Sequence, residues 1–182
     1  HALKSFPDLS IDWLWAHPRR KENLVVISTA EHGIEGYVGS AMMKVFMDEF
    51  APRLNSDDTG LLLVHAINPW GMKNHLRVNP DNVDLNRNFV HAGMYDPGIN
   101  PDYDLLAGFL NPQRPVRTLG KEAIPFLFKV IRYMIQPGRA RVQAASLLGQ
   151  HRHVKGIYFG GREAQEETAV LMRLYRKALG EY

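Results

Sequence analysis

Two side chains with metal-binding chemistry, His32 and Glu35, stand three residues apart shortly after the apolar segment 24–28. A strand that runs into a glycine-containing turn presents the side chains of that turn at the carboxyl edge of a sheet, where α/β proteins build their sites. Imidazole nitrogen and carboxylate oxygen are both common zinc ligands, and this spacing lets them converge on one cation. The pair therefore indicates a zinc site at the end of a strand.

The same turn allows two other interpretations. Glu35 could instead cap the following helix by accepting hydrogen bonds from its free backbone N–H groups. Gly33, Gly36 and Gly39 are evenly spaced at the start of that helix and could form a phosphate-binding loop. The phosphate interpretation is disfavoured because no Gly-Lys-Ser/Thr ending follows and because Glu35 places a negative charge where the phosphate would lie.

A second polar group, Arg77, Asn86 and Arg87, follows the next apolar segment. Arginine binds carboxylates through paired N–H groups, so two guanidinium groups and an amide on one loop favour a site for a substrate carboxylate. Asp84 could orient one of the two arginines. The alternative is a solvated loop that binds nothing.

Two further histidines, His151 and His153, lie in a basic segment late in the chain. They are the histidine pair whose position could complete a metal site begun by His32 and Glu35. A basic surface turn is the alternative interpretation.

The elements that must position these residues follow from hydrophobic patterning. The continuously apolar runs 24–28 and 60–66 are typical of strands covered on both faces, and the helix between them completes a βαβ unit. Residues 68–94 have no regular period, and a loop of that length in a compact domain is usually functional or disordered. We predict strands over 10–16, 24–28 and 60–66, and helices over 37–50, 103–110, 121–135, 140–148 and 163–179.

The composition limits which classes of protein this chain can belong to. With 182 residues and 45% hydrophobic content, the chain suits one globular domain, residues 1–182. The net charge is +3, but lysine and arginine are spread along the chain, which argues against nucleic-acid binding. Without cysteine, a metal must be held by His, Asp, Glu or backbone oxygen. No apolar run reaches the roughly 20 residues of a membrane helix, so we expect a soluble, cytoplasmic protein.

Several of these segments together resemble the zinc carboxypeptidase superfamily, in the branch near succinylglutamate desuccinylase and aspartoacylase. The resemblance runs from Leu24 to about Gly161 and is specific in combination, although each piece alone is not. It rests on His32-Gly33-Ile34-Glu35-Gly36, Asn68-Pro69-Trp70-Gly71, Arg77-Val78-Asn79, Asp84-Leu85-Asn86-Arg87-Asn88-Phe89, Gln150-His151-Arg152-His153 and Gly156-Ile157-Tyr158-Phe159-Gly160-Gly161.

The resemblance implies a role for each matching residue. His32 and Glu35 would be the first two zinc ligands, Arg77 would polarise the scissile carbonyl, and Asn86 and Arg87 would hold the free carboxylate of the substrate. The implied reaction is attack on an amide carbonyl by a zinc-bound water, with a carboxylate moving the protons. The implied fold is α/β, with three αβα layers and a mixed, mainly parallel sheet.

One part of the superfamily pattern is missing. Members supply a third ligand, a histidine in an Asp-Leu-His-Thr-like strand, and a general-base glutamate further on, and neither motif occurs before Tyr182. His151 or His153 could stand in for the ligand, but we expect instead a domain that is incomplete at its C-terminal end.

We therefore predict a zinc-dependent hydrolase of an amide bond next to a free carboxylate, either a carboxypeptidase or an N-acyl amino acid deacylase. Its partner would be a small molecule or peptide, and its oligomeric state is open. The first alternative is a catalytically inactive carboxylate-binding module that lacks a complete metal site. A serine or cysteine hydrolase is disfavoured, because cysteine is absent and no Gly-x-Ser-x-Gly sequence occurs.

Overall fold

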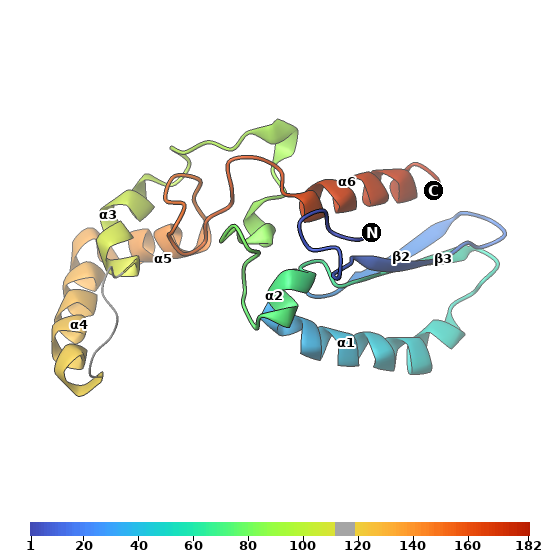
Figure 1. Ribbon diagram of the computed structural model, residues 1–182, viewed down its shortest axis with the longest axis horizontal. Helices are drawn as coiled ribbons and strands as arrows, with labels where there is room; N and C mark the ends of the chain where they lie inside the picture. Colours follow the sequence, from blue (N-terminus) through green and yellow to red (C-terminus); the bar gives the residue numbers. More distant parts are fainter. Residues whose placement is uncertain (112–118) are drawn as a thin grey trace. The chain divides into compact units, whose positions relative to one another are not determined.

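The computed structural model describes residues 1–111 and 119–182, so Pro112, which would follow the predicted helix 103–110, lies outside the described residues. The chain divides into two compact units, each of which is described by itself. Unit 1 comprises His1–Phe89 and Ala164–Tyr182, and unit 2 comprises Val90–Glu163 (Figure 1). Within the described residues, no helix combines the length and the apolar character needed to cross a membrane.

Unit 1 contains a small mixed sheet of three strands in the order β1-β3-β2. Strand β3 lies in the centre, parallel to β2 and antiparallel to β1, so the sheet has one pair of each kind where the sequence predicts a mainly parallel one. The central position of β3 explains its continuous apolar run, since Leu62 and Val64 have no exposed surface. The three predicted strands are confirmed as β1 (Asp12–Ala16), β2 (Asn23–Ser28) and β3 (Thr59–His65).

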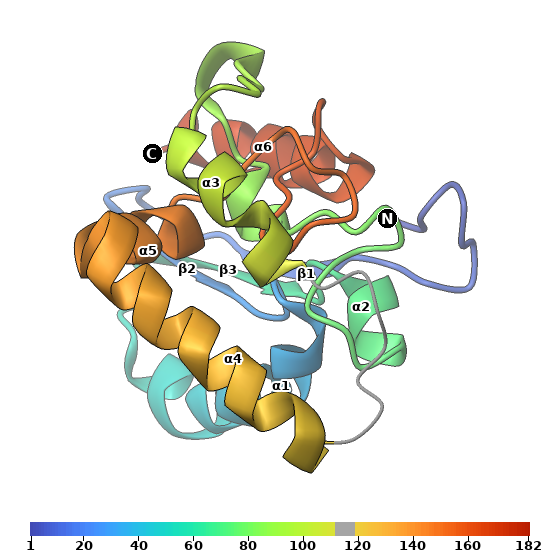
Figure 2. The same cartoon turned by 90° about the vertical axis from the view of Figure 1, so that its left-hand side faces the viewer.

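Helices α1 (Gly36–Val45) and α6 (Glu166–Leu179) lie along opposite sides of this sheet (Figures 1 and 2). The helical spacing of Leu171, Leu174 and Ala178 predicts an apolar face on α6, which is confirmed because all three side chains are buried. The helical spacing of Met43, Phe46, Met47 and Phe50 predicts that the apolar face of the 37–50 helix packs on the sheet, and this prediction is largely wrong. Its only buried apolar side chain is Met43, and one flank of α1, with a π-helical turn (Phe46–Phe50) after it, borders an open apolar groove of about 630 Å³.

The long segment after β3 is more regular than its sequence indicates. It contains a short helix, α2 (Pro69–Lys73), which begins with proline and is capped by the Asn68 side chain, a hydrogen-bond acceptor for the Gly71 N–H at 2.8 Å. Five residues are too few to show a helical period, which is why the pattern misses this helix. Single 3₁₀ turns occur at Gly33–Glu35, Ala51–Arg53, Leu85–Arg87 and His91–Gly93.

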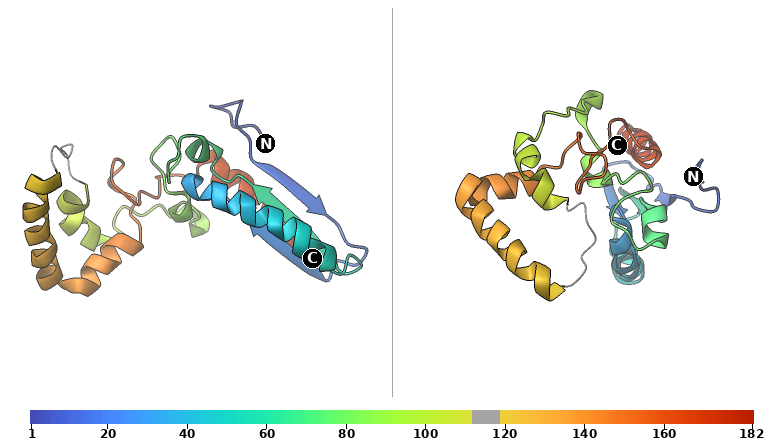
Figure 3. Two further views of the ribbon diagram at one scale, coloured as in Figure 1. Left: turned by 90° about the horizontal axis from the view of Figure 1, so that it is seen from below. Right: turned by 60° about the vertical axis from the view of Figure 1, so that its left-hand side comes forward.

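Unit 2 is helical, with α3 (Pro101–Leu110), α4 (Leu119–Tyr133) and α5 (Arg139–Leu147) at the three predicted places. Its buried cluster is formed by Tyr103, Leu106 and Ala145. A π-helical turn (Met134–Gly138) joins α4 to α5, which meet there at an angle (Figure 3). The break falls at Gln136, whose backbone is extended because a proline follows it. Pro125 lies inside α4, because this helix begins at Leu119 and not at the predicted residue 121.

Candidate functional site

The turn that carries His32 and Glu35 is fixed by close backbone contacts. It follows β2 in unit 1, and its N–H groups at Gly33 and Ile34 donate to the carbonyls of Arg77 and Leu76. Gly33 lies directly against α2, where a β-carbon would overlap the backbone of Gly71. A glycine is therefore required at position 33, and the turn presents the neighbouring His32 from a rigid support.

The imidazole of His32 lies between two carboxylates. Its Nδ1 is 3.1 Å from both carboxylate oxygens of Glu35, and its Nε2 is 3.2 Å from Oδ1 of Asp84. The His32 side chain is only 11% exposed, whereas that of Glu35 is 64% exposed. The predicted pair is thus brought together, with the outer carboxylate open to solvent and the inner one buried.

Asp84 is the centre of this arrangement and has no exposed surface. Besides His32, its carboxylate accepts hydrogen bonds from Nε of Arg77 at 3.0 Å and from the backbone N–H of Asn86 at 3.1 Å. The expectation that Asp84 orients one of the arginines is therefore confirmed for Arg77. One buried carboxylate holds the candidate metal ligand, the candidate carbonyl-polarising residue and the start of the 3₁₀ turn Leu85–Arg87.

Asn86 and Arg87 lie on that 3₁₀ turn, next to Asp84 in sequence. Asn86 is exposed and Arg87 is half-buried. One terminal nitrogen of Arg87 donates to the carbonyl of Asn86 at 3.2 Å, and its buried Nε has no hydrogen-bond partner within the part of the chain that the structure describes. This Nε–H is a buried donor without an acceptor, which costs the folded state free energy.

The structure describes no group of three or more His, Cys, Asp and Glu side chains that could hold a metal ion in residues 1–111 and 119–182. A catalytic zinc site commonly has three protein ligands, and His32 and Glu35 could supply two of them. A histidine that binds zinc usually donates its second ring N–H to a carboxylate, and Asp84 is placed to accept this hydrogen bond from His32.

A family model described as "Protein of unknown function (DUF2817)" matches residues 5–182. The chain belongs to this family. The match covers both units and every candidate site residue, but it is not a match to a zinc carboxypeptidase family, so the superfamily that the motifs resemble stays a prediction. Searches of curated proteins and of solved structures give no match.

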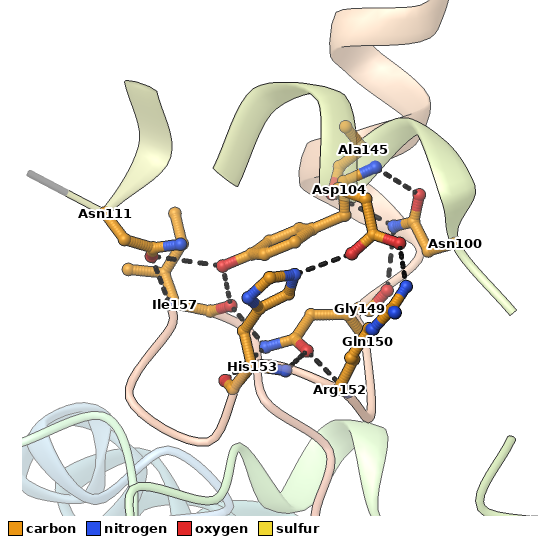
Figure 4. Close-up of polar contacts among 10 residues, drawn as sticks. Asn100, Asp104, Asn111, Ala145, Gly149, Gln150, Arg152, His153 and Ile157 are labelled. Atoms are coloured by element: carbon orange, nitrogen blue, oxygen red, sulfur yellow. Dashed lines mark hydrogen bonds and ion pairs between the residues drawn. The ribbon is translucent and has the colours of Figure 1, made fainter. Parts of the chain in front are cut away.

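In this DUF2817 chain, His151 and His153 both belong to unit 2 and each has a partner there. Nδ1 of the buried His151 donates to the carbonyl of Gly161 at 2.7 Å. Nε2 of His153 is 2.6 Å from the carboxylate of Asp104, which also binds Arg152 at 2.7 Å (Figure 4). The hydrogen bond from His153 is the main cause that lowers the pKa of Asp104. The two rings thus bind different groups and do not form a joint site within their unit.

Two asparagines of the segment 68–94 have structural roles that the sequence does not reveal. Asn88 has no exposed surface, and its Oδ1 accepts a hydrogen bond from the backbone N–H of Gln165 at 2.8 Å. Asn79 is also buried and donates to the Gln165 side chain at 2.8 Å. Because Gln165 precedes the first residue of α6, these contacts fix the start of that helix. Only a tertiary structure could reveal them, since the residues are more than 75 positions apart.

Glu31 was also missed by sequence reasoning, although it immediately precedes His32. Its side chain is half-buried, and burial raises the pKa of its carboxyl. The charge of Arg87 lowers that pKa, while the carboxylates of Asp84 and Glu35 raise it. An acidic residue beside a predicted ligand was the signal that could have identified it.

Proposed function

We propose that this chain carries the metal-binding and carboxylate-binding residues of a zinc-dependent hydrolase with a three-layer, zinc-peptidase-like fold. The reaction would cleave an amide bond next to a free carboxylate. The observation that carries the proposal is the imidazole of His32 between Glu35 and Asp84, with Arg77 on the second oxygen of Asp84.

The metal would be held by His32 and Glu35. Their nitrogen and oxygen atoms already face each other at 3.1 Å, and both are ligand types that zinc prefers. When bound, zinc would act as a Lewis acid and lower the pKa of a bound water to about 7. Asp84 would keep the ring of His32 in the tautomer that leaves Nδ1 free to bind a metal, by accepting a hydrogen bond from Nε2–H.

Arg77 and Arg87 would act on the substrate. Nε of Arg77 donates to Asp84, which orients the guanidinium, and Arg77 would stabilise the negative charge that develops on the carbonyl oxygen of the substrate. Asn86 and Arg87 would hold the free carboxylate, since a guanidinium binds a carboxylate through paired N–H groups. Two cations placed by one loop thus suit a substrate with a reacting carbonyl and a carboxylate close together.

Turnover tests this function. We expect zinc-loaded protein to release the free amino acid from N-acyl amino acids or short peptides. Glu35→Gln should abolish the activity, because an amide oxygen is a weaker zinc ligand than a carboxylate. Glu49→Gln, which removes the same charge from an exposed position on the π-helical turn, serves as the control and should retain full activity.

A catalytically inactive carboxylate-binding module is the second candidate. It is favoured by the lack of a three-ligand metal group in the described part of the chain. In that case, acyl amino acids would bind without zinc, Arg87→Ala would abolish binding, and no product would form. Retained binding without turnover in zinc-loaded protein would therefore decide for the module.

A further inference from the structure

Helix α4 and the π-helical turn after it expose apolar side chains along one side, which we call the α4 strip. Ile124 and Leu127 lie three residues apart, and Phe128 and Ile131 continue this spacing, which places side chains on one side of a helix. Ile135 extends the strip into the turn. The exposed fractions of these five side chains lie between 47% and 75%. A contiguous exposed apolar surface marks a site of interaction.

The α4 strip is not the side by which α4 packs within unit 2. That side carries Phe126 and Tyr133, whose rings lie 5.5 and 5.1 Å from the ring of Phe109 on α3, measured between centroids. Val130 belongs to the same side and is half-buried. Positions 126, 130 and 133 lie opposite positions 124, 128 and 131 on a helix of 3.6 residues per turn. In the described part of the chain, α4 (yellow to orange in Figure 3) is therefore held by one side and leaves the strip uncovered.

Two cations border the α4 strip. Lys129 directly follows Phe128 in the chain, and Arg132 lies one helical turn beyond Phe128. Both cationic side chains are exposed, and neither makes a hydrogen bond or an ion pair with a residue that the structure describes. The surrounding sequence is strongly basic, because residues 119–148 contain five basic residues and one acidic residue, a net charge of +4. The strip thus has a positively charged flank.

Charge distinguishes the α4 strip from the exposed apolar face of α1. The groove beside α1 is lined by residues that carry no charge, and Lys44 on that helix is paired with Asp48 at 2.7 Å. An apolar strip with a cationic flank is typical of helices that lie in the surface of a membrane. The apolar side enters the boundary of the acyl chains, and the cations bind anionic headgroups.

We propose that α4 binds reversibly to the surface of an anionic membrane, with the α4 strip among the acyl chains and Lys129 and Arg132 on the headgroups. The strip from Ile124 to Ile135 is about 17 Å long at 1.5 Å per residue, whereas a bilayer core is about 30 Å thick, so the helix lies along the surface. Because binding strength scales with the buried apolar area, one short helix binds reversibly. The inference does not depend on the proposed hydrolase.

Vesicle binding of the full chain tests this inference. The protein is mixed with vesicles of phosphatidylcholine alone or of equal parts phosphatidylcholine and phosphatidylserine, and the bound fraction is measured by co-sedimentation. Phe128→Ser interrupts the strip, and Lys129→Gln/Arg132→Gln removes both cations. The matched controls lie on α1, where Met42→Ser removes an apolar side chain that is 68% exposed and Lys44→Gln removes an exposed cation.

We expect the native chain to bind the phosphatidylserine vesicles at least about tenfold more tightly than phosphatidylcholine alone. Phe128→Ser should weaken this binding about tenfold, and the double variant should weaken it about twentyfold, because each cation near an anionic surface contributes about a factor of five. Met42→Ser and Lys44→Gln should bind as the native chain does. Circular dichroism of each variant establishes that it is folded.

A second measurement locates the contact. The chain has no cysteine, so Phe128→Cys and Met42→Cys each provide a single site for a fluorophore whose emission depends on polarity. With phosphatidylserine vesicles, emission from the label at position 128 should shift to shorter wavelength, and emission from the label at position 42 should not change.

Several outcomes would overturn the inference. These are no binding to either vesicle, equal binding to both, and binding that Met42→Ser weakens and Phe128→Ser does not. A chain that stays free of vesicles but dimerises in analytical ultracentrifugation, with dimers that Phe128→Ser abolishes, would also overturn it, because a second copy would then cover the α4 strip.

Discussion

Asp84→Asn is the substitution that tests the core of the candidate site most sharply. The native carboxylate is completely buried and receives three donors: Nε of Arg77, Nε2 of His32 and the backbone N–H of Asn86. An asparagine side chain has one oxygen to accept these hydrogen bonds, and its NH₂ group would face a donor. The variant therefore keeps the shape of the site but leaves at least one buried donor unpaired.

The expected cost is about 2 kcal/mol of unfolding free energy. Leaving one buried polar group without its partner costs about 1–3 kcal/mol, and loss of the charge adds to this. The larger penalty of about 3–5 kcal/mol for breaking a fully buried ion pair does not apply, because the Arg77 side chain is 41% exposed and can turn to water.

Urea unfolding followed by tryptophan fluorescence measures this cost. The three tryptophans, Trp13, Trp15 and Trp70, all lie in unit 1, so the signal reports on the unit that contains Asp84. Asp48→Asn is the control, since its side chain is 55% exposed, and it should change the free energy of unfolding by less than about 0.5 kcal/mol. If Asp84→Asn were as mild as this control, the account of Asp84 as the organising carboxylate would be refuted.

Three further substitutions have defined outcomes. Gly33→Ala should destabilise unit 1 by about 3 kcal/mol in urea unfolding, because its methyl group overlaps the backbone of α2, whereas Gly108→Ala meets no atom within 4 Å and should be neutral or stabilising. Asn88→Ala should cost about 2 kcal/mol in the same measurement and increase amide hydrogen exchange in the first turn of α6, and an unchanged exchange rate would contradict the proposed contact. The hydrogen bond from His153 lowers the pKa of Asp104, so the ion pairs of Asp104 stabilise the protein above pH 3.8, and this stability is lost as the pH falls through the lower pKa of the folded state. In His153→Ala, the free energy of unfolding should therefore fall less steeply with decreasing pH in that range. A decrease as steep as that of the native chain would contradict this prediction.

The sequence predicts the sheet well because its signals are local. The runs 24–28 and 60–66 are apolar enough to form strands, and the helix between them leads to a parallel pair. The prediction of burial on both faces holds for the central strand β3 and is wrong for β2, an edge strand in which no side chain is buried. The face of α6 is equally local, because its apolar residues recur with the helical period. These predictions need no knowledge of the rest of the chain.

The sequence-based predictions fail where contacts with distant residues or a capping side chain determine burial or helix formation. The apolar stripe of α1 predicts burial, but Val38, Met42 and Val45 are each more than half exposed, because periodicity states that a face is apolar and not what covers it. The short α2 depends on a cap and a proline, which a pattern of periods does not detect.

The candidate site was predicted in part. Its residue types and spacing identify His32 and Glu35, which the structure brings together at 3.1 Å. The sequence indicates that Asp84 orients one of two arginines, and the structure shows that this arginine is Arg77. The contact between Asp84 and His32 spans 52 positions and could not be read from spacing. Glu31 was missed because an acidic residue in a turn is ordinarily solvated.

Zinc titration of the purified chain tests the central claim most directly. The account predicts one zinc ion per chain, measured by calorimetry and metal analysis, with at least tenfold weaker binding in His32→Ala and in Glu35→Gln and unchanged binding in Glu49→Gln. A His151→Ala/His153→Ala variant shows in the same experiment whether either histidine is the third ligand. Zinc that binds equally well to all these variants, or no zinc binding at millimolar concentration, would contradict the metal site and with it the proposed hydrolase.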